Sequence, residues 1–252
     1  NNLDHDSLLE AGVMVVPAML GVLMTLLLSL ALAALLRLPR ERWGVFVAMT
    51  AFSNTLFIGL PVSTQLFGDA CIPYVMLYYL ANTGFLLIER AGTQGRGSVT
   101  LSSFLKGVFS KPPILTVLFS LVLLALDVGL PSPVMKWAGY ISGSVSPLAL
   151  IYCGYIIYEL GLKNLRLMRG LTTMIVVRLG VAPVVCWLFC RLFGMSGLPM
   201  SVFIVESALP VVSQVTVMAG AYGADEKYAA TGAALSTLCS FISIPILMLV
   251  LG

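Results

Sequence analysis

Two short polar stretches interrupt long apolar runs of this sequence. Asn54 and Thr55 stand within the stretch 52–61, and Ser213 and Gln214 follow Leu209-Pro210. Amides and hydroxyls can hydrogen-bond a carboxylate without placing a fixed charge in apolar surroundings. We therefore expect these four residues to bind an anionic substrate; the alternative is that they join packed helices through polar contacts.

Two ionisable residues, Arg178 and Glu206, also lie deep within apolar runs. Such residues are costly in a membrane and are usually functional or paired. Arg178 is expected either to contact the substrate or to cap free backbone carbonyls, with snorkelling to an interface as a third reading. Three roles are open for Glu206: pairing with Arg178, carrying a proton or binding a cation.

The elements that hold these residues follow from composition. The 252 residues are 59% hydrophobic and only 10% charged, with a mean hydropathy of +1.02. A soluble domain carries about 25% charged residues. The composition therefore excludes a soluble enzyme, a nucleic-acid-binding domain and a disordered chain. It predicts an all-α polytopic membrane protein surrounded by lipid, because the apolar runs are too long for barrel strands.

Charge-free runs of this length predict eight membrane-spanning helices. They are 12–36, 43–67, 70–89, 112–130, 134–160, 168–193, 197–222 and 228–251.

The loop charges predict the orientation of these helices. Eleven basic residues fall on one side, in the loops 37–42, 90–111 and 163–169 and at Lys227, against two on the other side. Basic loops stay in the cytoplasm. Both ends of this chain are therefore expected outside a plasma membrane, which in bacteria is the inner membrane.

The spans 43–67 and 197–222 share a peculiarity, since each carries helix-breaking residues beside polar ones. The predicted breaks are at Ser53, Gly59, Pro61 and Pro210. A break frees backbone groups, which the membrane tolerates only where they are buried in protein or line a cavity. The alternative is that these prolines simply kink packed helices.

The three spans before the loop 90–111 look like a weak repeat of the last three, in inverted orientation. Paired broken helices in inverted repeats indicate a secondary transporter. The chain then divides into the remainder of a first repeat (1–89), a cytoplasmic loop with an amphipathic stretch (90–111) and a second repeat (112–252).

Several motifs resemble those of the auxin efflux carrier family, which includes bacterial malonate-type carriers and the plant PIN-formed auxin exporters. Asn54-Thr55-Leu56-Phe57-Ile58-Gly59-Leu60-Pro61 with Phe67-Gly68 resembles its first crossover. Ala208-Leu209-Pro210 with Tyr222-Gly223-Ala224-Asp225 resembles its second crossover, and Ser146-Pro147-Leu148-Ala149-Leu150, Lys111-Pro112 and Arg178 also fit. The similarity spans the chain from residue 11 onward.

This resemblance implies ten helices in two inverted repeats of five, of which eight would be visible here. It also implies crossover helices in a transport domain, elevator-type alternating access, a homodimer and a small organic anion as substrate, such as malonate or an auxin-like weak acid. Ser53 departs from the proline that is common before the first Asn, which puts the tightness of that crossing in question. Glu206 is a second departure.

The alternative function is a sodium-coupled symporter of the bile-acid type, which has a similar broken-helix plan. That reading requires several acidic or carbonyl ligands, whereas Glu206 is the sole acid deep in a predicted span. Proton coupling is a further alternative to sodium. An intramembrane enzyme is not expected, because the sequence contains one histidine, His5, and no paired acids. No metal site and no cofactor are predicted.

Overall fold

The computed structural model describes residues 5–93, 115–116, 119, 122–123, 129–160, 167–221 and 223–251, and all its named elements are helices. The all-helical prediction is therefore confirmed for the described residues. In chain order the elements are α1 (His5–Leu35), α2 (Arg40–Ala51), η1 (Thr55–Gly59), α3 (Leu60–Phe67), η2 (Asp69–Cys71), α4 (Ile72–Thr93), α7 (Ser132–Leu160), α8 (Leu171–Val176), η4 (Val177–Val181), α9 (Ala182–Leu192), α10 (Gly197–Ser207), α11 (Gln214–Ala221) and α12 (Glu226–Leu251).

These helices occupy seven of the eight predicted segments, and most of the eighth, 112–130, lies outside the described residues. The predicted loop 90–111 begins later than expected, because α4 continues to Thr93; its amphipathic stretch is also outside the described residues. Within the described residues, three helices are long and apolar enough to cross a bilayer: Met14–Leu35, Leu171–Leu192 and Glu226–Leu251. The total of eight spans stays a prediction.

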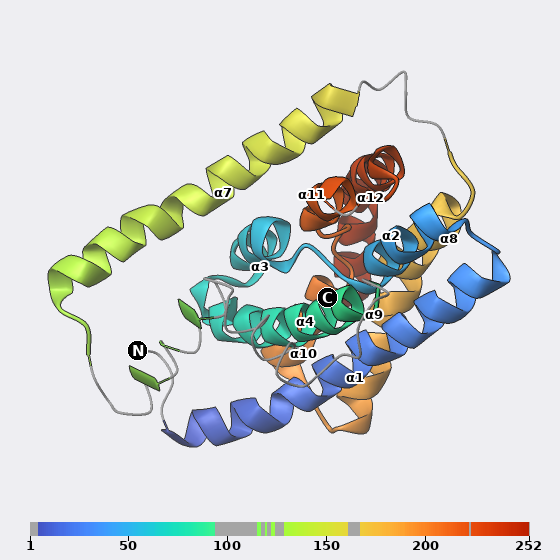
Figure 1. Cartoon of the computed structure of the whole chain (residues 1–252). Helices are drawn as coiled ribbons and strands as arrows, with labels where there is room; N and C mark the ends of the chain where they lie inside the picture. Colours follow the sequence, from blue (N-terminus) through green and yellow to red (C-terminus); the bar gives the residue numbers. More distant parts are fainter. Residues whose placement is uncertain are drawn as a thin grey trace.

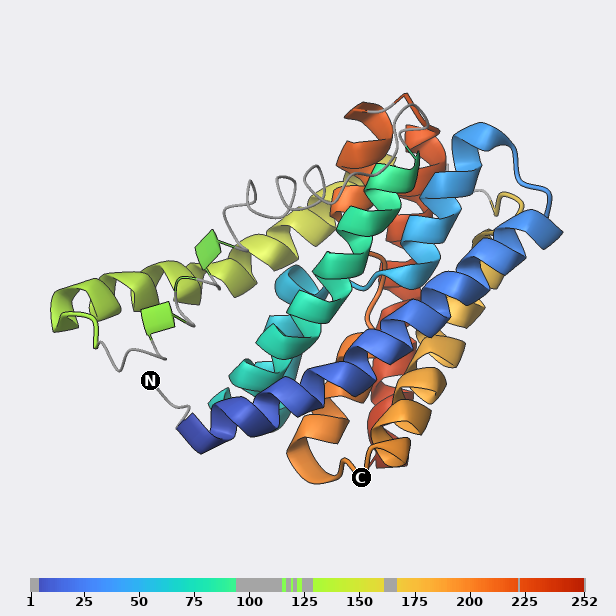
Figure 2. The ribbon, with the colours of Figure 1, turned by 60° about the horizontal axis from the view of Figure 1, so that its bottom comes forward.

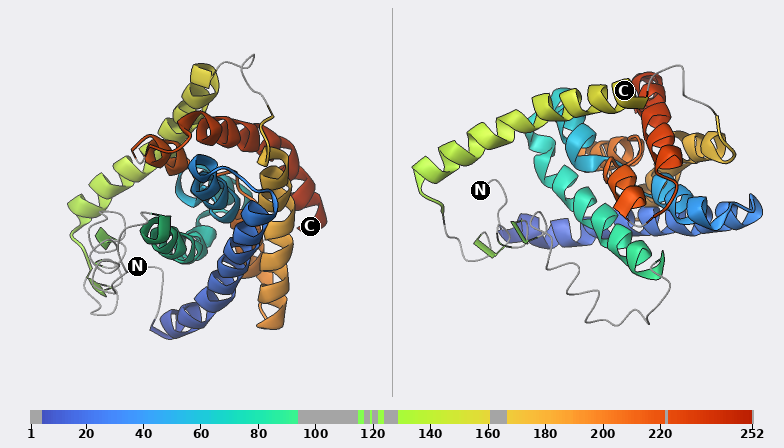
Figure 3. Two further views of the ribbon diagram at one scale, coloured as in Figure 1. Left: turned by 45° about the vertical axis from the view of Figure 1, so that its right-hand side comes forward. Right: turned by 45° about the horizontal axis from the view of Figure 1, so that its top comes forward.

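The helices surround a core formed by both halves of the chain. The long helix α1 packs against α2, α4 and α9, and α12 packs against α2, α8 and α11. Figure 1 shows α7 running along the opposite side of the molecule from α1, and Figure 3 shows the same arrangement from two other sides. Large side chains fill the interior without exposure, among them Phe46, Phe52 and Phe203.

Apolar side chains also cover much of the outer surface. Trp187 of α9 is 44% exposed, and Leu249 of α12 is 84% exposed. Contiguous apolar surfaces of this kind are rare on soluble proteins and mark contact with lipid or other proteins. The exposed faces of these helices therefore suit an integral membrane protein.

Both predicted crossover segments are interrupted, and the interruptions lie in the interior of the bundle (Figure 2). In the first segment α2 ends at Ala51 and the helix resumes at Thr55. In the second, α10 ends at Ser207 and α11 begins at Gln214. Pro210 explains the second interruption, because it has no N–H to donate and its ring excludes a regular preceding helical turn.

The prediction that Gly59 and Pro61 break the first segment was wrong. Gly59 ends η1 and Pro61 is the second residue of α3, so both lie in the helix that follows the break. The turn of η1 is π-helical, and this wider turn accommodates the proline ring and its missing N–H. The same arrangement recurs where the π-helical turn η4 precedes Pro183.

Candidate functional site

The two interrupted stretches pair with each other where they cross. Ser53 and Val211 form an antiparallel bridge. The N–H of Asn54 donates to the carbonyl of Pro210 at 2.9 Å, and the N–H of Val212 donates to the carbonyl of Phe52 at 3.3 Å. An unpaired backbone group in the membrane interior costs several kcal/mol. The crossing therefore satisfies part of the hydrogen-bonding demand that the two breaks create.

A polar side chain from a neighbouring helix supports each stretch. The carboxamide of Asn82 on α4 accepts a bond from the N–H of Ser53 at 3.2 Å and donates one to its carbonyl at 2.9 Å. On the other stretch, the N–H of Val211 donates to the hydroxyl of Ser236 on α12 at 3.2 Å. Ser53 and Pro210 thus lie in the breaks, and Ser53 uses a backbone N–H that a proline would lack.

The structure brings two of the predicted substrate-binding residues into direct contact. The Nδ2 of Asn54 donates to the Oγ of Ser213 at 2.6 Å, and the two residues are 2% and 5% exposed. Thr55 is buried beside them at the start of η1, whereas Gln214 is exposed at the start of α11. The Ser213 hydroxyl accepts the bond from Asn54 and retains its own proton to donate.

Arg178 lies on η4 and caps the ends of both half-helices that enter the crossing. Its Nη1 donates to the carbonyls of Thr50 and Ala51, at 3.3 and 2.7 Å, and its Nη2 donates to the carbonyl of Ser207. These carbonyls belong to the last turns of α2 and α10. The fork of donors on a guanidinium suits a task of this kind, because it can reach two chain ends at once.

This arrangement sets the electrostatics of the crossing. The carboxyl end of a helix carries a partial negative charge and the amino end a partial positive charge. Arg178, which is 1% exposed, offsets the negative ends of α2 and α10. The amino ends of η1 and α11 begin directly beside Asn54 and Ser213. The amino end of a helix favours an anion, because its first N–H groups point out of the helix.

Glu206 stands in the last turn of α10 and has a different partner from Arg178. Its Oε1 accepts a hydrogen bond from the hydroxyl of Ser63 on α3 at 2.7 Å, and the side chain is fully buried. The ion pair that the structure records among its described side chains joins Arg42 and Asp225 instead. Among all the residues that the structure describes, no three His, Cys, Asp or Glu side chains lie close enough together to bind a metal ion.

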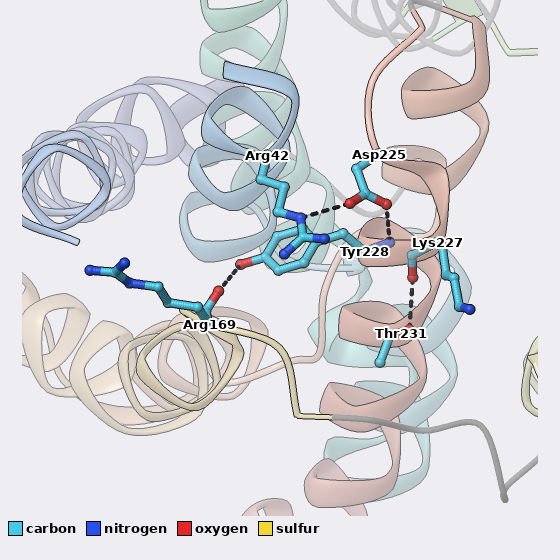
Figure 4. A network of polar contacts seen from close by, with 6 residues as sticks. All are labelled: Arg42, Arg169, Asp225, Lys227, Tyr228 and Thr231. Atoms are coloured by element: carbon cyan, nitrogen blue, oxygen red, sulfur yellow. Dashed lines mark hydrogen bonds and ion pairs between the residues drawn. The ribbon is translucent and has the colours of Figure 1, made fainter. Parts of the chain in front are cut away.

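A polar network joins the start of α2 to the start of α12 (Figure 4). The Nε of Arg42 lies 2.7 Å from an Asp225 oxygen, and its guanidinium stacks over the Tyr228 ring at 5.1 Å. Asp225 also accepts a bond from the N–H of Tyr228, and the Tyr228 hydroxyl donates to the carbonyl of Arg169. The start of the first crossover segment is therefore held beside the end of the second.

Sequence reasoning missed several residues that shape this site. Asn82 and Ser236 support the backbone of the crossing, Ser63 binds Glu206, and Arg42 pairs with Asp225. Asn82 offered a signal, since it is an amide within the apolar stretch 70–88. The hydroxyls of Ser63 and Ser236 offered none, because serine often bonds to its own helix.

One pocket is lined by residues other than those of the crossing. It encloses about 410 Å³ between the first half of α1 and the turn that joins α9 to α10, and Met14, Pro17, Phe193 and Pro199 are among its lining residues. None of its lining residues belongs to the crossing, where the key side chains are packed together.

Comparison with known proteins gives a consistent assignment. Residues 1–248 match the model of a family described as membrane transport protein. An uncharacterized transporter of Methanocaldococcus jannaschii is 27% identical over 214 residues, which cover 82% of this chain and 68% of the relative. An uncharacterized transporter of Methanothermobacter thermautotrophicus is 26% identical over 223 residues, which cover 84% of this chain and 68% of the relative. The chain therefore belongs to this family of integral membrane transport proteins, the auxin efflux carrier family that its crossover motifs resemble.

Proposed function

We propose that this protein is a secondary transporter that binds a small organic anion where the two interrupted segments cross. The observation that carries the proposal is the position of Arg178. Its guanidinium compensates the two helix ends that would repel an anion, and the two amino ends that attract an anion remain beside Asn54 and Ser213. A dicarboxylate such as malonate, or an auxin-like weak acid, has the required charge.

The donors at the crossing fit a carboxylate. Asn54 contributes an amide and Ser213 a hydroxyl, with Thr55 adjacent to Asn54 and Gln214 adjacent to Ser213. The first two are almost fully buried against each other. Binding an anion between them therefore requires the half-helices to separate, which suits an elevator-type alternation between a closed and an open crossing.

The proposed topology is an inverted repeat. The ion pair between Arg42 and Asp225 holds the start of the first crossover segment beside the end of the second, so the two run in opposite directions. Opposed broken helices with a site at their crossing are typical of secondary transporters. We further propose eight of ten helices in this chain, both of its ends outside the plasma membrane, and a homodimeric assembly.

The proposal is tested by thermal unfolding of the purified protein with a panel of anions. The panel contains malonate, oxalate, longer dicarboxylates and indole-3-acetate, each with and without sodium. A ligand at 100 times its dissociation constant stabilises the folded state by about 2.7 kcal/mol. We expect at least one anion to raise the unfolding temperature without sodium. Failure of every anion to do so would contradict the proposed substrate class, and an absolute requirement for sodium would favour the bile-acid-type alternative.

A further inference from the structure

The carboxyl group of Glu206 lies between the two crossover segments and is shielded from solvent. It belongs to α10 of the second segment and faces η1 and α3 of the first. Its side chain is fully buried, and the Ser63 hydroxyl that bonds it is fully buried as well. Among the described side chains, Arg178 and Glu206 are the two ionisable residues of the Arg, Lys, Asp and Glu types that are almost fully buried.

The two oxygens of this carboxyl have unequal surroundings. Oε1 accepts the bond from Ser63, whereas Oε2 is buried with no hydrogen-bond partner among the described residues. Oε2 lies against the backbone of η1 at Gly59, where a β-carbon would collide with it and with Leu209. The absence of a side chain at Gly59 thus makes the space that this oxygen occupies.

No cation compensates the carboxyl within the described residues. Arg178 uses its Nη atoms on the carbonyls of α2 and α10, and the recorded ion pair is elsewhere. The segments η1 and α3 contain no ionisable side chain. Two titratable groups on the other packed elements lie close enough to interact with Glu206, Cys71 of η2 and Tyr78 of α4, and neither is a cation. The basic side chains described on the packed helices α9 and α12, Arg191 and Lys227, are exposed at the ends of those helices.

A bare carboxylate in such a place costs several kcal/mol, because burial removes its hydration and only one hydrogen bond replaces it. A metal ion would remove that cost only with several oxygen ligands. The structure offers the Glu206 carboxyl and the Ser63 hydroxyl here, and no group of three metal-binding side chains elsewhere in the described part of the chain. A proton needs a single oxygen, and Oε2 is available for it.

We propose that Glu206 is a proton-binding site that couples proton movement to anion movement at the crossing; this rests on the proposed transport function. Oε2 forms an O–H bond with a proton from water on one side of the membrane and releases that proton to water on the other side. The link to the substrate runs through η1. The N–H of Gly59 donates to the carbonyl of Asn54 at 2.9 Å, while the same glycine packs against Glu206. A shift of Asn54 on anion binding therefore moves the backbone that covers Oε2.

The experiment compares the whole wild-type chain with Glu206→Gln, which keeps the shape of the side chain and cannot ionise. Glu226→Gln is the matched control, because it makes the same change on an exposed residue of α12. The first readout needs no substrate: the infrared C=O band of a protonated carboxylic acid is followed against pH in lipid vesicles. The second is uptake of labelled malonate into vesicles with and without a pH gradient, beside malonate exchange at equal pH.

In the wild type and in Glu226→Gln we expect a protonated-carboxyl band that changes with pH, and in Glu206→Gln we expect that band to be missing. For one proton per anion, one unit of pH gradient should give up to about tenfold malonate accumulation. Glu206→Gln should lose this accumulation and keep malonate exchange. A band that persists in Glu206→Gln, or accumulation equal to that of the wild type, would overturn the proton site. If neither the wild type nor either variant transports malonate, but the carboxyl band that is missing in Glu206→Gln changes with pH in the wild type, the proton site stands and the proposed substrate fails.

Discussion

The amide of Asn54 donates a 2.6 Å hydrogen bond to the hydroxyl of Ser213, across 159 residues of sequence and between two helices that are each interrupted at that point. Both residues are almost completely buried. The contact closes the crossing, and its groups are also the ones best suited to hold a carboxylate. In the proposed function, an arriving anion and this hydrogen bond compete for the Asn54 amide, so the bond belongs to the proposed closed state.

Arg178 should matter for stability more than any exposed arginine. Arg178→Met removes the donors from three carbonyls at two helix ends, and we expect it to lower the free energy of unfolding by about 3–5 kcal/mol. Arg178→Lys should be intermediate, because an ammonium lacks the fork that spans both ends. Denaturant unfolding in detergent measures the effect. The control is Arg191→Met at an exposed site in the last turn of α9, with an expected change within about 0.5 kcal/mol. Equal stability of Arg178→Met and the wild type would show that the capping bonds contribute nothing.

Asn82 should favour serine over proline at position 53, because it bonds the backbone N–H and carbonyl of Ser53. Ser53→Pro removes the N–H that bonds Asn82 and leaves a buried amide oxygen unsatisfied, at a cost of about 1–3 kcal/mol. Ser53→Ala keeps both backbone bonds and should cost less. In an Asn82→Leu background, the penalty of Ser53→Pro should shrink, because the lost partner is already absent. A double-mutant cycle on unfolding measures this coupling, and additive effects would argue against it.

Asp225 should have two separable roles at the start of α12. Asp225→Asn removes the charge partner of Arg42 but keeps an oxygen for the N–H of Tyr228. The pair is partly exposed, with side chains 30% and 19% accessible, so the loss should be no more than about 1 kcal/mol and should shrink with added salt. Asp225→Ala also removes the helix cap and should cost about 1 kcal/mol more. Identical losses for Asn and Ala at all salt concentrations would refute this division.

Gly59 should be sensitive to a single added methyl group. Gly59→Ala places a β-carbon into Glu206 and Leu209, and we expect destabilisation of about 1–3 kcal/mol from overpacking. Gly139→Ala on α7 is the matched control, since nothing lies within 4 Å of its added carbon. That change should be neutral or stabilise by up to about 1 kcal/mol. Shortening the neighbour with Glu206→Ala should reduce the penalty at Gly59. If Gly59→Ala unfolds like the wild type, the close approach is not a real constraint.

Sequence patterns predict the helical segments and both interruptions of this fold, because long charge-free runs and buried polar residues are visible locally. They also single out Arg178, Asn54 and Ser213. They include Ser53 in the first break, where the helix does stop, but they also predict breaks at Gly59 and Pro61, where a wide turn at η1 accommodates the proline. Local patterns contain no information on whether a proline will be absorbed or will end a helix.

Contacts between residues far apart in the sequence could not be predicted either, because local patterns do not show which helices pack together. Asn82, Ser236 and Ser63 act through residues 25 to 143 positions away. Each is a single polar side chain whose periodicity says which helix holds it but not which neighbour it meets. For the same reason the sequence left two roles open for Arg178, substrate contact and helix capping. In the structure its guanidinium bonds three carbonyls at helix ends, which is the capping arrangement.

Equilibrium binding of labelled malonate to the purified chain tests the central claim most directly. Asn54→Ala and Ser213→Ala each remove one donor group from the crossing, whereas Ser29→Ala removes an equally buried hydroxyl that bonds within α1. The account predicts saturable binding to the wild type and to Ser29→Ala, and affinity at least about tenfold weaker, or 1.4 kcal/mol, for both crossing variants. Binding of malonate with unchanged affinity to Asn54→Ala and Ser213→Ala would contradict it.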